Sequence, residues 1–179
     1  MSPTTPSRYA PALRWLHWTI FVLVLLAYVA VNLHEVFPRG SELRSNVLAG
    51  HFLAGIAVLL LVLPRLAVRF THVDPPILPT PERWNQLLSK ITHLALYLFL
   101  IAQPIMGIAT LQIAGQPITI FGVTVLPALF GPGNRDLAHQ WGEIHGTVGN
   151  IFYYVIGLHI LGALWHHFGR KDNTLRRML

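Results

Sequence analysis

The sequence contains no cysteine. Disulfide bonds, iron–sulfur clusters, thiol catalysis and covalent c-type haem attachment are therefore excluded. Charge is also scarce, because charged residues make up 11% of the chain, whereas soluble domains average about 25%. With 53% hydrophobic residues and a mean hydropathy of +0.52, the chain cannot cover a water-exposed surface with charge. These deficits exclude an ordinary soluble domain and a disordered chain, and they indicate a membrane protein.

Acidic residues are the rarest charged type. Seven Asp and Glu stand against 13 Lys and Arg, which gives a formal net charge of +6 over 179 residues. A nucleic-acid-binding protein would cluster its cations on a polar face. Here the cations interrupt apolar runs instead, so we interpret them as determinants of membrane topology and expect no nucleic-acid partner.

Long hydrophobic runs, by contrast, are abundant. Four of them approach the roughly 20 residues that a helix needs to cross a bilayer, and they cover residues 13–33, 47–66, 87–113 and 141–168. The apolar segment 121–130 is too short to span, so we expect a loop against the membrane surface. The chain thus predicts one all-α domain over residues 1–179, an integral membrane four-helix bundle in contact with lipid.

The distribution of cations predicts the orientation of this bundle. With the N-terminus in the cytoplasm, ten cations fall on the cytoplasmic side, and only Arg39, Arg44 and Arg135 fall on the other. Cytoplasmic segments of membrane proteins carry an excess of Lys and Arg. We therefore expect both termini to be cytoplasmic.

Ten histidines outnumber the acids, and four of those that fall inside the predicted spans match in pairs at two depths. His17 and His159 belong to the cytoplasmic half, and His51 and His145 to the outer half. His145 and His159 are 14 residues apart, which is just under four helical turns, so both point along nearly the same face about 21 Å apart. Each therefore has one partner at its own depth on another helix.

Ionisable side chains inside a membrane are costly and usually functional. Two neutral imidazoles that face each other across a bundle core are typical of axial ligands of a b-type haem. We therefore predict two haem b groups, with His51 and His145 binding the outer iron and His17 and His159 the inner iron. The alternatives are hydrogen bonding of each histidine in the core and a zinc site, which would require four ligands in one tetrahedron.

Other residues near the four histidines leave two interpretations open. The neighbouring glycines allow a porphyrin to approach the backbone, or they serve helix packing; they are Gly50, Gly55, Gly146, Gly149, Gly157 and Gly162. His166 lies two turns beyond His159 on the same face, where it either binds a quinone carbonyl near the inner haem or is an interfacial residue. A pocket role for His93 is equally open.

Several motifs, in their order and positions, resemble the bacterial cytochrome b561 family over nearly the whole chain. They are Arg14-Trp15-Leu16-His17-Trp18, Gly50-His51, Ile144-His145-Gly146, Gly157-Leu158-His159, His166-His167 and Lys171-Asp172-Asn173-Thr174-Leu175-Arg176-Arg177-Met178. The resemblance implies a four-helix di-haem b protein of the bacterial inner membrane. It also implies that His17, His51, His145 and His159 are the axial ligands.

Within this family the sequence is most similar to the superoxide oxidase type, which implies periplasmic superoxide as electron donor and ubiquinone as acceptor. Steering of the superoxide anion on the outer side would fall to Arg39, Arg44 and Arg135. Acidic residues lie on the same side, so the sequence shows no net positive surface there.

Two other functions remain open at this point. One is a haem-bearing membrane anchor that passes electrons between a partner dehydrogenase or hydrogenase and quinone. The other is a transporter whose histidines bind a transition metal ion. The sequence also leaves open whether the loop 116–134 covers the outer haem.

Overall fold

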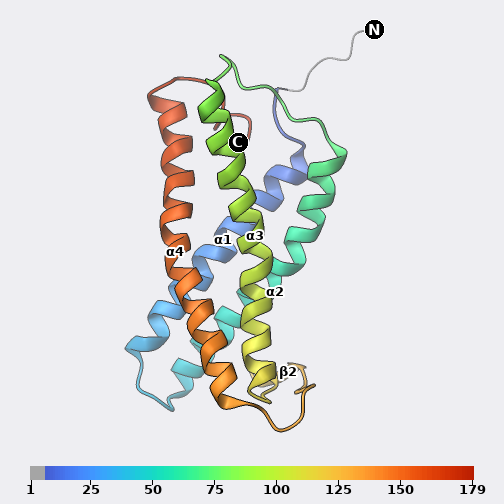
Figure 1. Cartoon of the computed structure of the whole chain (residues 1–179), viewed down its shortest axis with the longest axis vertical. Helices are drawn as coiled ribbons and strands as arrows, with labels where there is room; N and C mark the ends of the chain where they lie inside the picture. The colour runs from blue at the N-terminus through green and yellow to red at the C-terminus, as the bar shows by residue number, and fades with distance from the viewer. Residues whose placement is uncertain (1–6) are drawn as a thin grey trace.

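The computed structural model describes residues 7–179, and four long helices dominate it (Figure 1). The elements, in order, are α1 (Pro11–Leu33), a 3-10 turn η1 (His34–Val36), α2 (Glu42–Thr71), α3 (Arg83–Ile113), β1 (Ile118–Ile120), β2 (Val123–Leu126) and α4 (Arg135–Phe168). All four helices are long and apolar enough to cross a membrane. The prediction of an all-α membrane protein with four spanning helices is confirmed.

The helices are longer than the predicted spans. The second span was expected over residues 47–66, whereas α2 covers Glu42–Thr71. Hydropathy detects only the part of a helix that lies in hydrocarbon. N-terminal caps set where α2 and α4 begin. The side chain of Ser41 accepts a hydrogen bond from the backbone N–H of Arg44, and that of Asn134 accepts one from Leu137.

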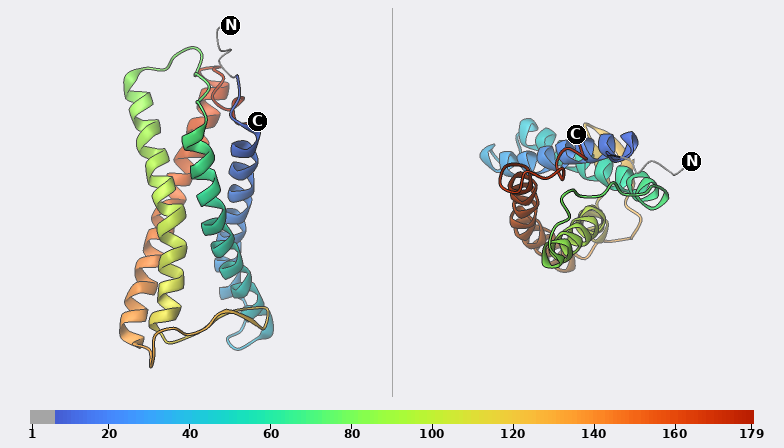
Figure 2. Two further views of the ribbon diagram at one scale, coloured as in Figure 1. Left: turned by 90° about the vertical axis from the view of Figure 1, so that its right-hand side faces the viewer. Right: turned by 90° about the horizontal axis from the view of Figure 1, so that it is seen from above.

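The helices pack as two pairs, α1 with α2 and α3 with α4, which are joined mainly through α2 and α3 (Figure 2). Few large side chains are buried, although Phe99 of α3 stacks on Phe152 of α4 with ring centroids 4.1 Å apart. Outward-facing apolar side chains such as Leu60 and Leu161 are more than 60% exposed. A lipid bilayer is the environment that covers such a surface.

The segment between α3 and α4 is more regular than the predicted surface loop. β1 and β2 form an antiparallel hairpin whose turn has positive φ at Phe121 and Gly122. Ile118 and Ile120 are buried, and β1 packs on α2, so the segment crosses the end of the bundle (Figure 2). Phe121 and Val123 remain exposed. We call this end of the bundle the hairpin end.

The opposite end holds both ends of the described chain. The backbone N–H of Tyr9 donates to the carbonyl of Arg177 at 3.0 Å, and the indole N–H of Trp18 donates to the carbonyl of Met178 at 3.0 Å. The C-terminal segment also contacts the α2–α3 connection, because the N–H of Asn173 donates to Leu78. We call this the terminal end. The contacts place both ends of the described chain at the same end of the bundle.

Candidate functional site

At the hairpin end, His51 of α2 and His145 of α4 face each other. Their ring centroids are 6.1 Å apart and the rings are nearly perpendicular, at 88°. The Nδ1 atoms of His51 and His145 lie 2.9 Å and 3.1 Å from the carbonyl oxygens of Ala27 and Gln103. A carbonyl only accepts, so each Nδ1 carries the proton and each Nε2 keeps its lone pair. This is the usual arrangement of a metal-binding histidine.

A cavity of about 400 Å³ surrounds this pair. Its volume falls in the range of small-molecule and cofactor sites. All four helices line the cavity, and Ile118 of the hairpin contributes to its wall. A Cβ added to Gly55 or Gly146, which both line the cavity, would meet no protein atom within 4 Å. The space beside these two glycines therefore has room for a flat group close to the backbone.

At the terminal end, His17 of α1 and His159 of α4 form a second pair. Their ring centroids are 6.2 Å apart with an angle of 75° between the rings. A third ring, that of His93 on α3, lies 5.3 Å from His159. The structure thus brings together the partners that depth matching in the sequence had paired, and it adds His93 beside them.

The ring separations decide which pairs can share a metal. A metal midway between two imidazoles lies about 3 Å from each ring centroid, which is a bond of about 2 Å to nitrogen plus about 1 Å from nitrogen to the ring centre. Separations of 6.1 Å and 6.2 Å fit this requirement. The 5.3 Å separation of His93 from His159 is too short. Both predicted pairs therefore fit a two-histidine metal centre.

A tetrahedral zinc site has no counterpart among residues 7–179. No group of three or more His, Asp or Glu side chains is arranged there to hold an ion. His17, His51, His145 and His159 instead form two facing pairs at two separate depths. Within the described chain, the geometry favours two linear centres over one tetrahedral site.

Arg65 of α2 is a site residue that the sequence did not reveal. Its Nη1 donates to the carbonyl of Leu13 at 3.0 Å, and its Nη2 lies 3.3 Å from Nδ1 of His17. The guanidinium also lies over the ring of Tyr97, 5.7 Å from the centroid. In the sequence Arg65 is simply a cation at the end of the second apolar run. Only the packing of α1 on α2 shows that it faces the terminal-end pair.

His166 is buried at the end of α4 rather than exposed at an interface. Its Nδ1 lies 2.5 Å from Oδ2 of Asp172, and its Nε2 lies 3.2 Å from Oδ1 of Asn85. Burial raises the pKa of the Asp172 carboxyl, but hydrogen bonds from His166 and Thr174 outweigh this effect and lower the pKa below its usual value. The Asp172 carboxylate therefore holds the C-terminal segment against α4.

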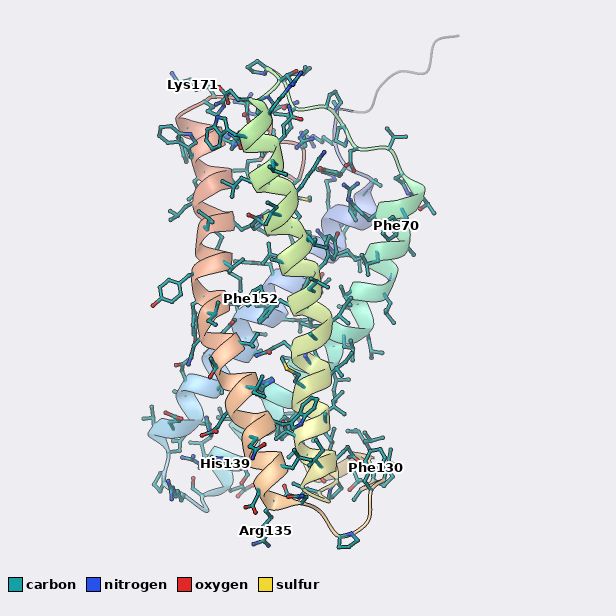
Figure 3. The ribbon with its side chains drawn as sticks, in the orientation of Figure 1. Phe70, Phe130, Arg135, His139, Phe152 and Lys171 are labelled. Atoms are coloured by element: carbon teal, nitrogen blue, oxygen red, sulfur yellow. The ribbon has the colours of Figure 1, made fainter. Side chains whose placement is uncertain are left out.

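The three cations of the hairpin end differ in their contacts. Arg39 and Arg135 are exposed, and Figure 3 shows Arg135 at the hairpin end, opposite Lys171. Arg44 instead donates to the carbonyls of His34 and Phe37, at 2.9 Å and 3.0 Å. Arg44 therefore closes the α1–α2 connection, whereas Arg39 and Arg135 face solvent.

Comparison with known proteins identifies the family. A family model described as prokaryotic cytochrome b561 matches residues 8–179. The chain is 34% identical to Cytochrome b561 homolog 1 of Escherichia coli (strain K12) over 173 residues, which cover 97% of both chains. It is 37% identical to Probable superoxide oxidase CybB of Yersinia pestis over 164 residues, which cover 92% of this chain and 91% of the relative. The chain belongs to the prokaryotic cytochrome b561 family, and it is a multi-pass haem b-binding electron-transfer protein of the bacterial inner membrane.

Proposed function

We propose that the chain carries electrons from superoxide on the periplasmic side to ubiquinone on the cytoplasmic side, through two b haems. His51 and His145 hold the outer haem, and His17 and His159 hold the inner one. The observation that carries this proposal is the presence of two facing histidine pairs, with ring separations of 6.1 Å and 6.2 Å, at opposite ends of one bundle. The similarity to a relative named Probable superoxide oxidase supports the choice of donor.

The distribution of Lys and Arg gives the orientation of the bundle in the membrane. Ten of the 13 Lys and Arg residues belong to the terminal end and its adjoining helix segments, and three belong to the hairpin end. Cations concentrate on the cytoplasmic side of membrane proteins. Both termini are therefore cytoplasmic, and the cavity around His51 and His145 lies in the periplasmic half.

The protein contributes ligation, orientation and exclusion of water. When bound, each haem supplies a one-electron redox centre. The carbonyls of Ala27 and Gln103 hold the outer histidines in the ligating tautomer. Ile118 of the hairpin forms part of the wall at this end. Since two histidines would hold each haem iron, no position would remain for the donor, which would give up its electron without binding to iron.

The electron balance requires two donors for each acceptor. Two superoxide anions each lose one electron and leave as O₂, and one ubiquinone takes up these two electrons and two protons from water on the cytoplasmic side to become ubiquinol. His166 donates to the quinone carbonyl through Nε2–H, which exchanges its contact with Asn85 for the quinone. Both ring nitrogens then carry protons, because the Asp172 carboxylate that faces Nδ1 also only accepts. Asp172 keeps the other ring nitrogen in place.

Replacing Gly107 with alanine is expected to weaken haem binding at the outer site. A Cβ on Gly107 would lie 3.3 Å from Cε1 of His145, so the imidazole must move by a few tenths of an ångström. Haem titration of the apoprotein should show a severalfold weaker outer site. The matched control is Gly142→Ala, whose Cβ makes only an ordinary contact of 3.6 Å with Thr110. Equal haem affinity in the two variants would contradict the packing argument.

Reversing the exposed outer cations is expected to slow the reaction with superoxide. Arg39→Glu with Arg135→Glu replaces attraction of the anion by repulsion, so the bimolecular rate should fall about tenfold at low ionic strength. Its decrease with added salt should also disappear. The control is Arg83→Glu, an exposed cation at the terminal end. A stopped-flow rate and salt dependence equal to those of the unchanged protein would exclude steering by these residues.

The donor is tested by adding enzymatically generated superoxide to the purified oxidised protein, with and without ubiquinone. Prompt haem reduction, followed by reoxidation and ubiquinol formation only when ubiquinone is present, would support the proposal. Haems that superoxide leaves oxidised but that a co-purifying dehydrogenase or hydrogenase reduces would establish the membrane-anchor function instead.

A further inference from the structure

Arg65 is a cation held inside the bundle by uncharged partners. It lies on α2 beyond Pro64, within a helix that can span the membrane. Its described contacts are the carbonyl of Leu13, the ring nitrogen of His17 and the face of the Tyr97 ring. A charge in this position is costly unless an opposite charge compensates it.

Two other arginines of the terminal end, Arg69 and Arg170, have such compensation. Arg69, one turn further along α2, forms an ion pair with Asp74, and Arg170 pairs with Glu82. In the part of the chain that the structure describes, the carboxylates that form ion pairs contact Arg69, Arg170 or a histidine, and none contacts Arg65. The counter-charge of Arg65 therefore does not come from the described residues.

The contact between Arg65 and His17 cannot persist when His17 binds a metal. A guanidinium has only N–H donors, so Nη2 can face Nδ1 of His17 only while that nitrogen carries a lone pair. A histidine that binds metal through Nε2 carries its proton on Nδ1, as His51 and His145 are arranged to do. Two donors would then face each other at 3.3 Å. Ligation by His17 thus frees one edge of the guanidinium for an anion.

We propose that Arg65 binds a propionate carboxylate of the inner haem and raises the reduction potential of that haem. This inference rests on the proposed assignment of His17 and His159 as inner ligands. A haem carries its own carboxylates, which are the anionic groups brought to this depth when the site fills. A fixed positive charge beside the haem favours the reduced form, which carries one positive charge fewer. Electrons arriving from the outer haem therefore collect at the inner one.

The test is a redox titration of the two-haem protein, followed by haem absorbance. Arg65→Gln should lower the equilibrium constant for electron transfer from the outer to the inner haem at least tenfold. This corresponds to a fall of about 59 mV in the midpoint potential of the inner haem. Arg65→Lys keeps the charge and should retain most of the potential. The matched control Arg69→Gln removes a cation one turn away that already has a carboxylate partner, and it should leave both potentials unchanged.

If Arg65→Gln loses the inner haem, its potential cannot be measured, so a second experiment measures haem affinity instead. In protein carrying His51→Ala, which leaves only the inner site, the affinities for haem b and for its dimethyl ester are compared. With Arg65 present, the free acid should bind at least tenfold more tightly than the ester. Arg65→Gln should abolish this preference, whereas Arg69→Gln should retain it.

Two results would overturn the proposal: unchanged potentials in Arg65→Gln, or an acid preference that survives this substitution. Either would leave the two-haem electron-transfer function intact. A wild-type protein that binds fewer than two haems would instead overturn both the proposed function and the role of Arg65.

Discussion

Replacing His51 or His145 with alanine is expected to remove one of two haems and to leave the other in place. The two rings face each other across one cavity at a separation that fits a shared metal. Removing either ring leaves the iron with one protein ligand and an open position. The terminal-end pair belongs to a different depth of the bundle and keeps both of its rings. Haem content per chain should therefore fall from two to one in each variant.

The control is His139→Ala on the same helix. His139 is exposed and its nearest acidic group is Glu143, at 3.7 Å, so both haems should remain. Pyridine haemochrome analysis with a protein assay gives the ratio. Equal loss of both haems in His51→Ala, with the protein still folded by circular dichroism, would contradict the pairing of His51 with His145.

Replacing His17 or His159 with alanine is expected to remove the other haem. The two variants should have the same reduced-minus-oxidised spectrum, that of the outer haem alone, because each removes one ligand of the same iron. His93→Ala should keep both haems, since the 5.3 Å separation of His93 from His159 is too short for a shared metal. His93 is thus the control within the same cluster.

Different spectra for His17→Ala and His159→Ala would contradict their pairing. Retention of the inner haem in His17→Ala, together with its loss in His93→Ala, would assign the second ligand to His93. Low-temperature absorption spectra of the purified variants, in which the two haems are resolved, distinguish these results.

The helices could be predicted from the lengths of the apolar runs, and the histidine pairs from helical periodicity together with the depth of each histidine in its span. Four apolar runs long enough to span a bilayer specify four helices. The spacing of 14 residues between His145 and His159 puts both on one face of α4 whatever surrounds it. In the structure His51 faces His145, and His17 faces His159. Their role as haem ligands remains a prediction for the substitutions described above.

The contacts that sequence analysis missed depend on residues far apart in the chain. Arg65 meets His17 only because α1 packs against α2. His166 is buried because Asp172 and Asn85 reach it from the C-terminal segment and from α3. No local pattern around Arg65 or His166 contains this information.

The hairpin was missed for a different reason. β1 and β2 have only three and four residues, which is too short for alternation of apolar and polar residues to be distinguished from an apolar loop. The buried Ile118 and Ile120 alternate with Thr119, but packing on α2 and pairing with β2 decide the conformation. The predicted loop at the membrane surface is therefore a short hairpin that closes one wall of the cavity.

Haem stoichiometry tests whether the four histidines hold two b haems at two depths of the bundle. The purified wild-type protein should contain two haem b per chain, and a redox titration should resolve two one-electron steps in the α-band absorbance. A content of one haem per chain, with a single one-electron step in the titration, would contradict the assignment of two haem sites.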